Sequence, residues 1–184
     1  EGEPVNSHFS EKYIVDTMNA ISSLQKMEEV NPKKIGYWGH SNGGEIGLRV
    51  ITISSQIRSA VFWAGVVGSY KDMLETYNDQ IPFLKDADHE LLEKYGLPSE
   101  APHFWNRADP HSYLKYISIP VQLHHGTADE SVPVELTLEL KQELEKLDKP
   151  VEYYEYEGDN HNIGNNAETA WDRSIDLFNR TLKK

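Results

Sequence analysis

The sequence predicts an α/β fold in three layers, with a parallel sheet between two layers of helices. The first observation behind this prediction is that short apolar runs alternate along the chain with stretches of helical periodicity. The second is that residues 57–67 lack the polar alternation of a half-exposed strand, as a strand covered on both faces does. Strands joined by helices need right-handed crossovers, so the sheet is expected to be parallel.

Each expected element has its own pattern. Apolar residues at three- and four-residue steps predict helices over residues 7–30, 41–52, 134–147 and 168–182, the first with Ser7 or Ser10 as its N-cap. Runs rich in β-forming residues predict strands over residues 33–38, 57–67, 121–125 and 151–156.

Residues 68–116 interrupt this alternation. They contain short helical patterns separated by prolines, at residues 70–77, 89–95 and 112–116. We interpret the segment as a lid-like insertion over the carboxyl edge of the sheet. Four of its aromatic side chains are candidates for the wall of a substrate pocket, namely Tyr70, Phe83, Phe104 and Trp105.

The bulk composition fits one folded domain over residues 1–184, with 38% hydrophobic and 26% charged residues. The formal net charge of −12 disfavours nucleic acid and anionic membranes as partners. No apolar run reaches the roughly 20 residues of a membrane-spanning helix. The chain has no cysteine, which excludes a cysteine nucleophile and leaves the compartment open, with the cytoplasm favoured. The oligomeric state also stays open.

The strongest local signal is at residues 39–44, which read G-H-S-N-G-G between a predicted strand and a predicted helix. A G-x-S-x-G sequence in this position predicts a sharp, strained turn that exposes the hydroxyl of Ser41. The backbone N–H of Asn42 then points to where an oxyanion would form. Any serine between glycines can make a turn, so the assignment depends on finding a base and an acid.

Both partners follow later strands. Asp129 lies in the loop after residues 121–125, and His161 lies in the loop after residues 151–156. The order Ser, Asp, His is the one that this kind of turn uses. Asp159 and Glu130 are the alternative acids, but Asp159 is only two residues from His161 and Glu130 adjoins Asp129. We therefore predict Ser41 as nucleophile, His161 as general base and Asp129 as the acid.

The other histidines of these motifs have simpler interpretations. His40 is expected to pack or to hydrogen-bond within the turn. His124 and His125 are adjacent on a strand, so they point to opposite faces and are not expected to share a metal ion. We expect no metal and no cofactor.

On three motifs the chain resembles the α/β-hydrolases, in particular the prolyl oligopeptidase-like and dienelactone-hydrolase-like branch: residues 39–44, 125–133 and 158–161. The resemblance covers the C-terminal part of that fold. It implies the triad Ser41, Asp129 and His161, and a catalytic domain that here lacks its N-terminal strands, which would pair beside residues 35–38. The second oxyanion donor would come from the same missing part.

The resemblance has two departures. Dienelactone hydrolases use a cysteine nucleophile, and related dipeptidyl peptidases anchor the substrate's amino terminus with glutamates outside this chain. Because ester cleavage needs fewer parts, the expected function is hydrolysis of a small carboxylic ester through an acyl-enzyme. The alternatives are a serine peptidase of the prolyl oligopeptidase-like branch acting on short peptides, and a non-catalytic homologue that serves in binding.

Overall fold

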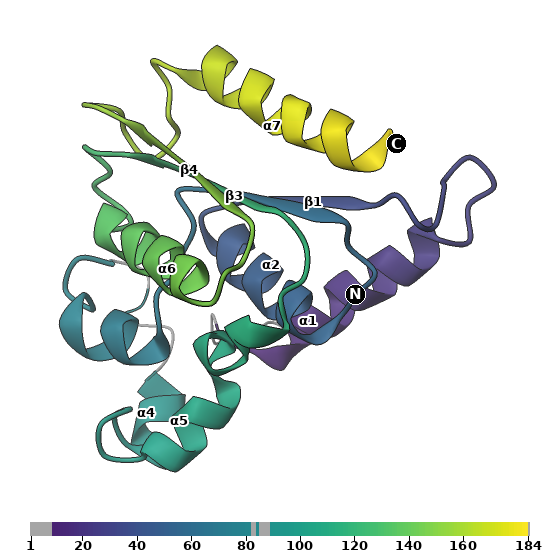
Figure 1. Ribbon diagram of the computed structural model, residues 1–184. Helices are drawn as coiled ribbons and strands as arrows, with labels where there is room; N and C mark the ends of the chain where they lie inside the picture. The colour runs from purple at the N-terminus through teal and green to yellow at the C-terminus, as the bar shows by residue number, and fades with distance from the viewer. Residues whose placement is uncertain (1–8, 82–83, 85–88, 184) are drawn as a thin grey trace.

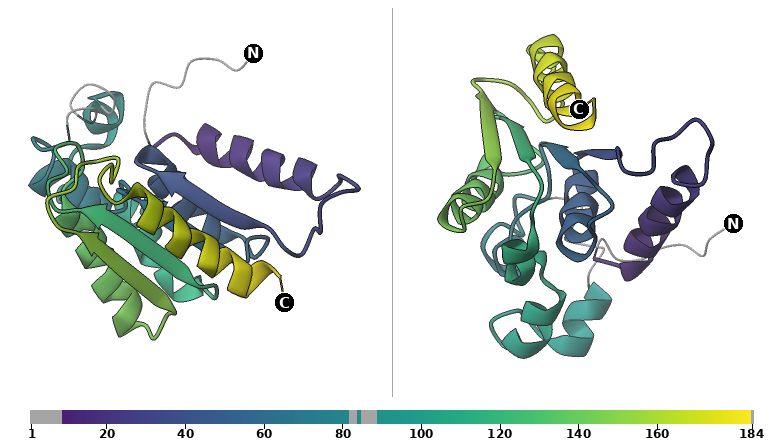
Figure 2. Two further views of the ribbon diagram at one scale, coloured as in Figure 1. Left: turned by 90° about the horizontal axis from the view of Figure 1, so that it is seen from above. Right: turned by 45° about the vertical axis from the view of Figure 1, so that its right-hand side comes forward.

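The three-layer prediction is confirmed by a computed structural model, which describes residues 9–81, 84 and 89–183. Its sheet is parallel, and the strands lie in the order β1 (Gly36–His40), β2 (Ser59–Trp63), β3 (Val121–Gly126) and β4 (Val151–Tyr156). One face is covered by α7 (Ala167–Leu182), and the other by α2 (Asn42–Ile53) and α6 (Val134–Lys146) (Figure 1). Helix α1 (Glu11–Leu24) packs beside α2 (Figure 2).

The apolar core explains why β2 lacks polar alternation. Every residue of β2 and β3 is buried. The largest cluster fills the space between the sheet and the α2 and α6 layer, where Leu48, Phe62, Leu123 and Leu140 are almost fully buried. A second cluster lies on the α7 face and includes Trp63 and Leu177. Within the described residues, no helix is both long and apolar enough to cross a bilayer.

Three elements differ clearly from their predicted bounds, and one of them is β2, which covers residues 59–63 rather than 57–67. Helix α1 ends at Leu24, six residues earlier than predicted, and Ser10 is its N-cap. Strand β1 begins at Gly36 rather than at residue 33 and continues to His40. A Cβ on Gly36 would lie 2.6 Å from the Phe178 ring of α7. The strand therefore starts where the chain passes closely beneath α7, and it delivers Ser41 directly from its carboxyl end.

Among the residues that the structure describes, the insertion contains a helix that was not predicted, α5 (Pro102–Ala108). The elements of the insertion are η1 (Asp72–Thr76), α4 (His89–Tyr95), α5 and η2 (Pro110–Tyr116). Pro102 was interpreted as a separator, but it occupies the start of α5, where a missing N–H costs nothing. These elements lie beyond α2 and α6, and η2 contacts both helices (Figure 1). The role of the segment as a lid stays a prediction.

Helix α7 buries Leu177 and two small side chains, but it leaves two of its large ones exposed. Trp171 and Ile175, which carry its apolar pattern, are 44% and 50% exposed, whereas Ala170 and Ser174 are fully buried. The sheet presents large side chains to this helix, and the Trp63 indole donates a 3.0 Å hydrogen bond to the Ser174 hydroxyl. Close approach to such a surface requires small residues on the helix.

A largely buried histidine, His111, connects the insertion to the chain after β2 and to α6. The His111 Nδ1 lies 2.7 Å from a Glu143 carboxylate oxygen, and Nε2 lies 2.8 Å from the Val67 carbonyl. Both partners are acceptors, so both ring nitrogens must donate and the ring is charged. Burial disfavours that charge, but the bond to Glu143 and the charges of Asp109 and Glu143 outweigh it and raise the pKa of His111.

Replacing His111 with Gln is expected to lower the free energy of unfolding by about 1.5–3 kcal/mol at about pH 6, as loss of a hydrogen bond to a charged group does. The folded-state pKa lies above the unfolded value, so the stabilisation is complete below the unfolded pKa of about 6.5 and declines as the pH rises through the folded pKa. The loss at about pH 9 should therefore be smaller. Urea denaturation at both pH values measures the difference, with the exposed His103→Gln as control. Equal losses at both pH values would contradict a charged His111.

Candidate active site

All three predicted catalytic side chains lie at one edge of the sheet. Because the strands are parallel, their carboxyl ends face the same way, and the loops that follow them meet there. Ser41 follows β1, Asp129 lies after β3, and His161 lies after β4. The arrangement joins residues that are up to 120 positions apart in the sequence.

Ser41 has the strained backbone expected of the turn. Its φ of 56° and ψ of −122° place a residue with a side chain in a region that normally suits glycine. The end of β2 holds it there, because its N–H donates to the Trp63 carbonyl at 3.0 Å and its carbonyl accepts from Val66 N–H at 3.0 Å. Within the described part of the chain, the Ser41 hydroxyl makes no hydrogen bond.

Two glycines of this turn are required by close contact, and a third is not. A Cβ on Gly39 would lie 2.3 Å from the Gly43 carbonyl oxygen, and a Cβ on Gly44 would lie 2.7 Å from the Cα of Gly65. Both neighbouring atoms belong to the backbone, so they cannot rotate away as the end of a side chain can. A Cβ on Gly43 would meet nothing within 4 Å, although Gly43 belongs to the G-x-S-x-G sequence.

Asn42 is the first residue of α2, so its N–H has no acceptor inside the helix. The amino-terminal end of a helix carries a partial positive charge that favours anions. The predicted oxyanion donor therefore lies next to the predicted nucleophile, at the end of a helix dipole.

Asp129 is a buried carboxylate with four donors around it. Its Oδ2 accepts from His161 Nδ1 at 2.8 Å and from His125 Nε2 at 3.0 Å. Its Oδ1 accepts from the N–H groups of Ser131 and Val132 at 2.8 and 3.0 Å. Burial alone would raise the pKa of Asp129, but these hydrogen bonds outweigh it and hold the pKa well below its usual range.

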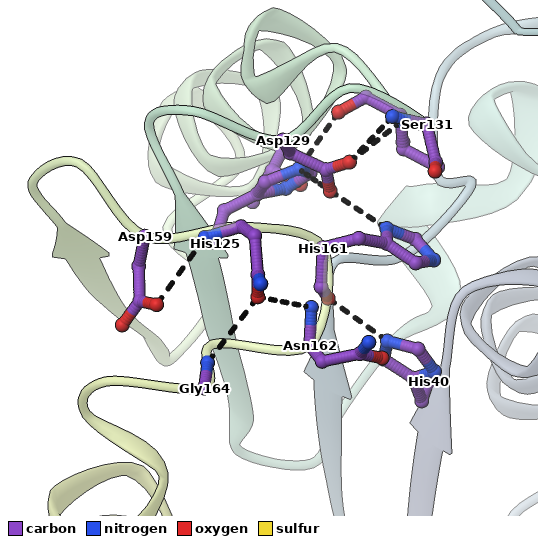
Figure 3. A network of polar contacts seen from close by, with 11 residues as sticks. His40, His125, Asp129, Ser131, Asp159, His161, Asn162 and Gly164 are labelled. Atoms are coloured by element: carbon purple, nitrogen blue, oxygen red, sulfur yellow. Dashed lines mark hydrogen bonds and ion pairs between the residues drawn. The ribbon is translucent and has the colours of Figure 1, made fainter.

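His161 is held at two points (Figure 3). Its ring bonds to Asp129 through Nδ1, and its backbone carbonyl accepts from His40 Nε2 at 3.0 Å. His40 precedes Ser41, and the two imidazole rings lie 4.6 Å apart between centroids. His161 is therefore linked both to Asp129, which follows β3, and to His40 at the end of β1. The bond from His40 could not be seen in the sequence, where the residue has no distinguishing pattern.

No hydrogen bond links the Ser41 hydroxyl to His161 Nε2 among the described residues. Such contacts are often long in proteins without substrate and shorten in the complex. With Nδ1 occupied by Asp129, the Nε2 of His161 is the nitrogen left to exchange a proton.

The loop after β3 (residues 127–133) and the loop after β4 (residues 157–166) are bonded directly to each other. They are called the acid loop and the base loop below, after the predicted roles of Asp129 and His161. Thr127 N–H donates to the Tyr156 carbonyl at 3.0 Å, and Ala128 N–H donates to the Asp159 carbonyl at 2.9 Å. A Cβ on Gly126 would lie 2.3 Å from that same Asp159 oxygen. Glycine at this position therefore lets the two loops approach closely enough for the His161–Asp129 bond to form.

The two alternative acids have other surroundings. Asp159 is fully buried and accepts hydrogen bonds from Asn160, Asn165 and Asn166, which close the loop around it. In Figure 3 its carboxylate points away from the His161 ring. Glu130 is exposed. Of the three carboxylates, Asp129 is the one bonded to His161.

His124 and His125 lie on opposite faces of β3, as predicted. His124 bonds to Gln122 and Tyr156, and burial lowers its pKa to about 3. His125 bonds to Thr137 of α6 and to Asp129. Among the described residues, no three side chains of His, Asp or Glu are grouped so that they can hold a metal ion.

The aromatic side chains of the insertion line a groove that does not include the predicted triad. Tyr70, Phe104 and Trp105 contribute to a groove of about 950 Å³ between the start of α1, the second half of α2 and the insertion. Neither Ser41 nor His161 lines it. The fourth candidate, Phe83, lies outside the described residues.

A parallel sheet with a strained serine between a strand and a helix, and with acid and histidine loops at the same edge, defines the α/β-hydrolase class. The chain matches the prolyl oligopeptidase family over residues 4–184. It belongs to this family, a family of serine hydrolases, as the motifs indicated.

The relatives are considerably longer than this chain. The chain is 29% identical over 157 residues to the uncharacterized peptidase YtmA of Bacillus subtilis, an alignment that covers 85% of the chain and 58% of that protein. It is 23% identical over 162 residues to the uncharacterized peptidase YuxL of the same organism, covering 86% of the chain and 23% of that protein.

Solved structures share the fold at lower identity. The uncomplexed acylaminoacyl peptidase of Pyrococcus horikoshii superposes with a TM-score of 0.77 at 21% identity, over 93% of this chain and 28% of that one. A puromycin-hydrolyzing peptidase of Mycobacterium tuberculosis gives a TM-score of 0.72 at 22% identity, over 92% and 25% of the two chains.

The two adjacent glycines after Asn42 should respond differently to a methyl group. Gly44→Ala is expected to lower the free energy of unfolding by about 1–3 kcal/mol, the usual cost of overpacking, because its Cβ would press on the backbone of Gly65. Gly43→Ala should be neutral or stabilise by up to about 1 kcal/mol, because Ala suits a helix better than Gly. Chemical denaturation of both variants compares them, and equal losses would contradict the packing described.

Proposed function

We propose that the protein is a serine hydrolase in which Ser41 is the nucleophile, His161 the general base and Asp129 the acid that orients it. The observation that carries the proposal is the double attachment of His161, by its ring to Asp129 and by its backbone to His40 beside Ser41. A role in binding alone is disfavoured, because every member of the triad is present and Ser41 has a strained backbone.

The mechanism follows from the proton positions. Nδ1–H of His161 donates to Asp129, which leaves the Nε2 lone pair to take the proton of Ser41. The serine oxygen attacks the substrate carbonyl, and the oxyanion that forms is stabilised by the Asn42 N–H at the start of α2. Protonated His161 then gives its proton to the leaving group, and water releases the acyl group by the same steps. The ionised Asp129 stabilises the imidazolium in both halves.

For the substrate, we propose short peptides or aminoacyl amides, with small carboxylic esters as the second candidate. The sequence favoured esters because their cleavage needs fewer parts. The names of the relatives favour amides, since two are peptidases and a structural neighbour is an acylaminoacyl peptidase. The acyl-enzyme chemistry is the same for both classes.

We propose that residues 1–184 form part of one catalytic domain and that residues 68–116 bound the site as a lid. Val132 of the acid loop and Leu136 of α6 are fully buried in the apolar cluster that also contains Met73 and Trp105 of the insertion. A movement of the insertion would therefore displace the start of α6, which is close to Asp129 in the sequence.

In the intact protein, Ser41→Ala is expected to abolish turnover and labelling by a fluorophosphonate probe without unfolding the protein. The residue serves chemistry at a turn, and its hydroxyl makes no hydrogen bond among the described residues that folding would lose. A panel of aminoacyl anilides and p-nitrophenyl esters gives the substrate class. Anilide turnover supports a peptidase, and a preference for esters would restore the second candidate. Unlabelled wild-type protein would refute the proposed chemistry.

Asp129→Asn is expected to lower kcat by orders of magnitude, about 10⁴-fold if it acts as the corresponding change does in serine proteases. The Asn side chain would place an NH2 donor where the carboxylate accepts hydrogen bonds from both imidazoles. His161 would then have to accept at Nδ1 and carry its hydrogen on Nε2, which is the wrong tautomer for a base. Glu130→Gln is the matched control, because it removes the same charge from an exposed neighbour. Similar losses in the two variants would mean that another group orients His161.

A further inference from the structure

We propose that His125 is a positioning residue for the catalytic acid, which it holds toward His161 through its Nε2–H. The inference rests on the proposed serine chemistry and adds a fourth residue to it. Its starting point is that the two histidines share one oxygen: Oδ2 of Asp129 accepts from His161 Nδ1 at 2.8 Å and from His125 Nε2 at 3.0 Å (Figure 3).

The partners of His125 fix where its proton lies. Its Nε2 is 3.0 Å from Asp129 Oδ2 and 3.0 Å from the Val132 carbonyl oxygen, and both of these atoms are acceptors. The nitrogen must therefore carry a hydrogen. Its Nδ1 is 2.7 Å from the Thr137 hydroxyl, which can donate to it. A neutral ring protonated at Nε2 thus satisfies every polar atom of this group.

Burial makes this donor hard to replace. His125 is fully buried, and the Asp129 side chain is 1% exposed, so water has little access to either group. The N–H groups of Ser131 and Val132 hold Oδ1, and His125 shares the hold on Oδ2 with His161. Without His125, Oδ2 would keep a single partner, the group that has to move a proton during catalysis.

A neutral donor suits the chemistry better than a cation would. Asp129 has to remain charged so that it can stabilise the imidazolium form of His161. A hydrogen bond from neutral His125 stabilises the carboxylate and fixes its direction without cancelling its charge. The role of His125 is therefore geometric and electrostatic, and no bond to it is made or broken.

The chain offers a matched control in the preceding residue. His124 is as deeply buried as His125, on the same strand, but its ring bonds to Gln122 and Tyr156 on the opposite face. A change at either histidine therefore alters a fully buried position. A change at His125 alone removes a donor from Asp129.

The test compares His125→Leu, His125→Asn and His125→Gln with His124→Leu and His124→Gln in the intact protein. Leu removes the donor, and the Asn side chain is too short to reach Asp129. The Gln amide can take the place of the ring Nε2 and donate. We expect Leu and Asn to lower kcat about 10²-fold with KM unchanged within a factor of about 2, as misplaced catalytic groups do. Gln at position 125 should restore most of kcat.

A second measurement reports the acid directly. The low-field proton resonance of the His161–Asp129 hydrogen bond should shift or broaden in His125→Asn and persist in His125→Gln and in the folded His124 variants. If His125→Leu does not fold, the comparison of His125→Asn with His125→Gln still tests the inference. Equal kcat in that pair, or a resonance unchanged in His125→Asn, would overturn the inference.

The design separates this inference from the proposed function. If the wild-type protein neither turns over substrate nor labels with a fluorophosphonate, the serine chemistry itself fails. If the wild type labels and Ser41→Ala does not, while the His125 variants match the His124 variants, the chemistry stands and the positioning role is refuted.

Discussion

The site depends on keeping a carboxylate ionised where water does not reach it. An isolated charge in such a place would take up a proton or unfold its surroundings, because burial costs a charged group several kcal/mol. Asp129 avoids both outcomes by accepting four hydrogen bonds. Two of these bonds come from its own loop, and two come from imidazoles on other parts of the chain. Its charge therefore organises the loop that carries it and fixes the ring of His161.

Each of the loops that carry Ser41, Asp129 and His161 is hydrogen-bonded to a neighbouring strand or loop. The end of β2 holds the strained backbone of Ser41, and the base loop bonds to the acid loop through Ala128 and Asp159. His40, at the end of β1, donates a hydrogen bond to the His161 carbonyl of the base loop. Glycines stand where two backbones touch, as at Gly126. The strain at Ser41 can persist in the folded protein because the hydrogen bonds of its own N–H and carbonyl fix its backbone from both sides.

The sequence predicted most of the fold, and it also predicted the loops that carry the three residues of the proposed triad, because these signals are local. The buried strand β2 is an apolar run, and Ser41, Asp129 and His161 follow runs of β-forming residues in loops rich in turn-forming residues. The bounds of β1 and the existence of α5 were not predicted. Gly36 begins β1 because α7 passes close by, and a proline looks the same in sequence whether it ends a helix or begins one. The hydrogen bonds of individual histidines, such as His40 to His161 and His125 to Asp129, leave no pattern in the sequence.

The histidines show how partners, not residue type, decide what a ring does. His111 faces acceptors at both nitrogens and is held charged, whereas His124 and His125 each face one hydroxyl that can donate, and a neutral ring satisfies them. His161 differs from all three, because among the described residues its ring is bonded at Nδ1 alone, and to a carboxylate. A ring whose charged form is stabilised on one side, and whose other nitrogen has no protein partner, can take up and release a proton without breaking the structure around it. That combination is what a general base requires, and it arises from the placing of Asp129 rather than from anything in the sequence next to His161.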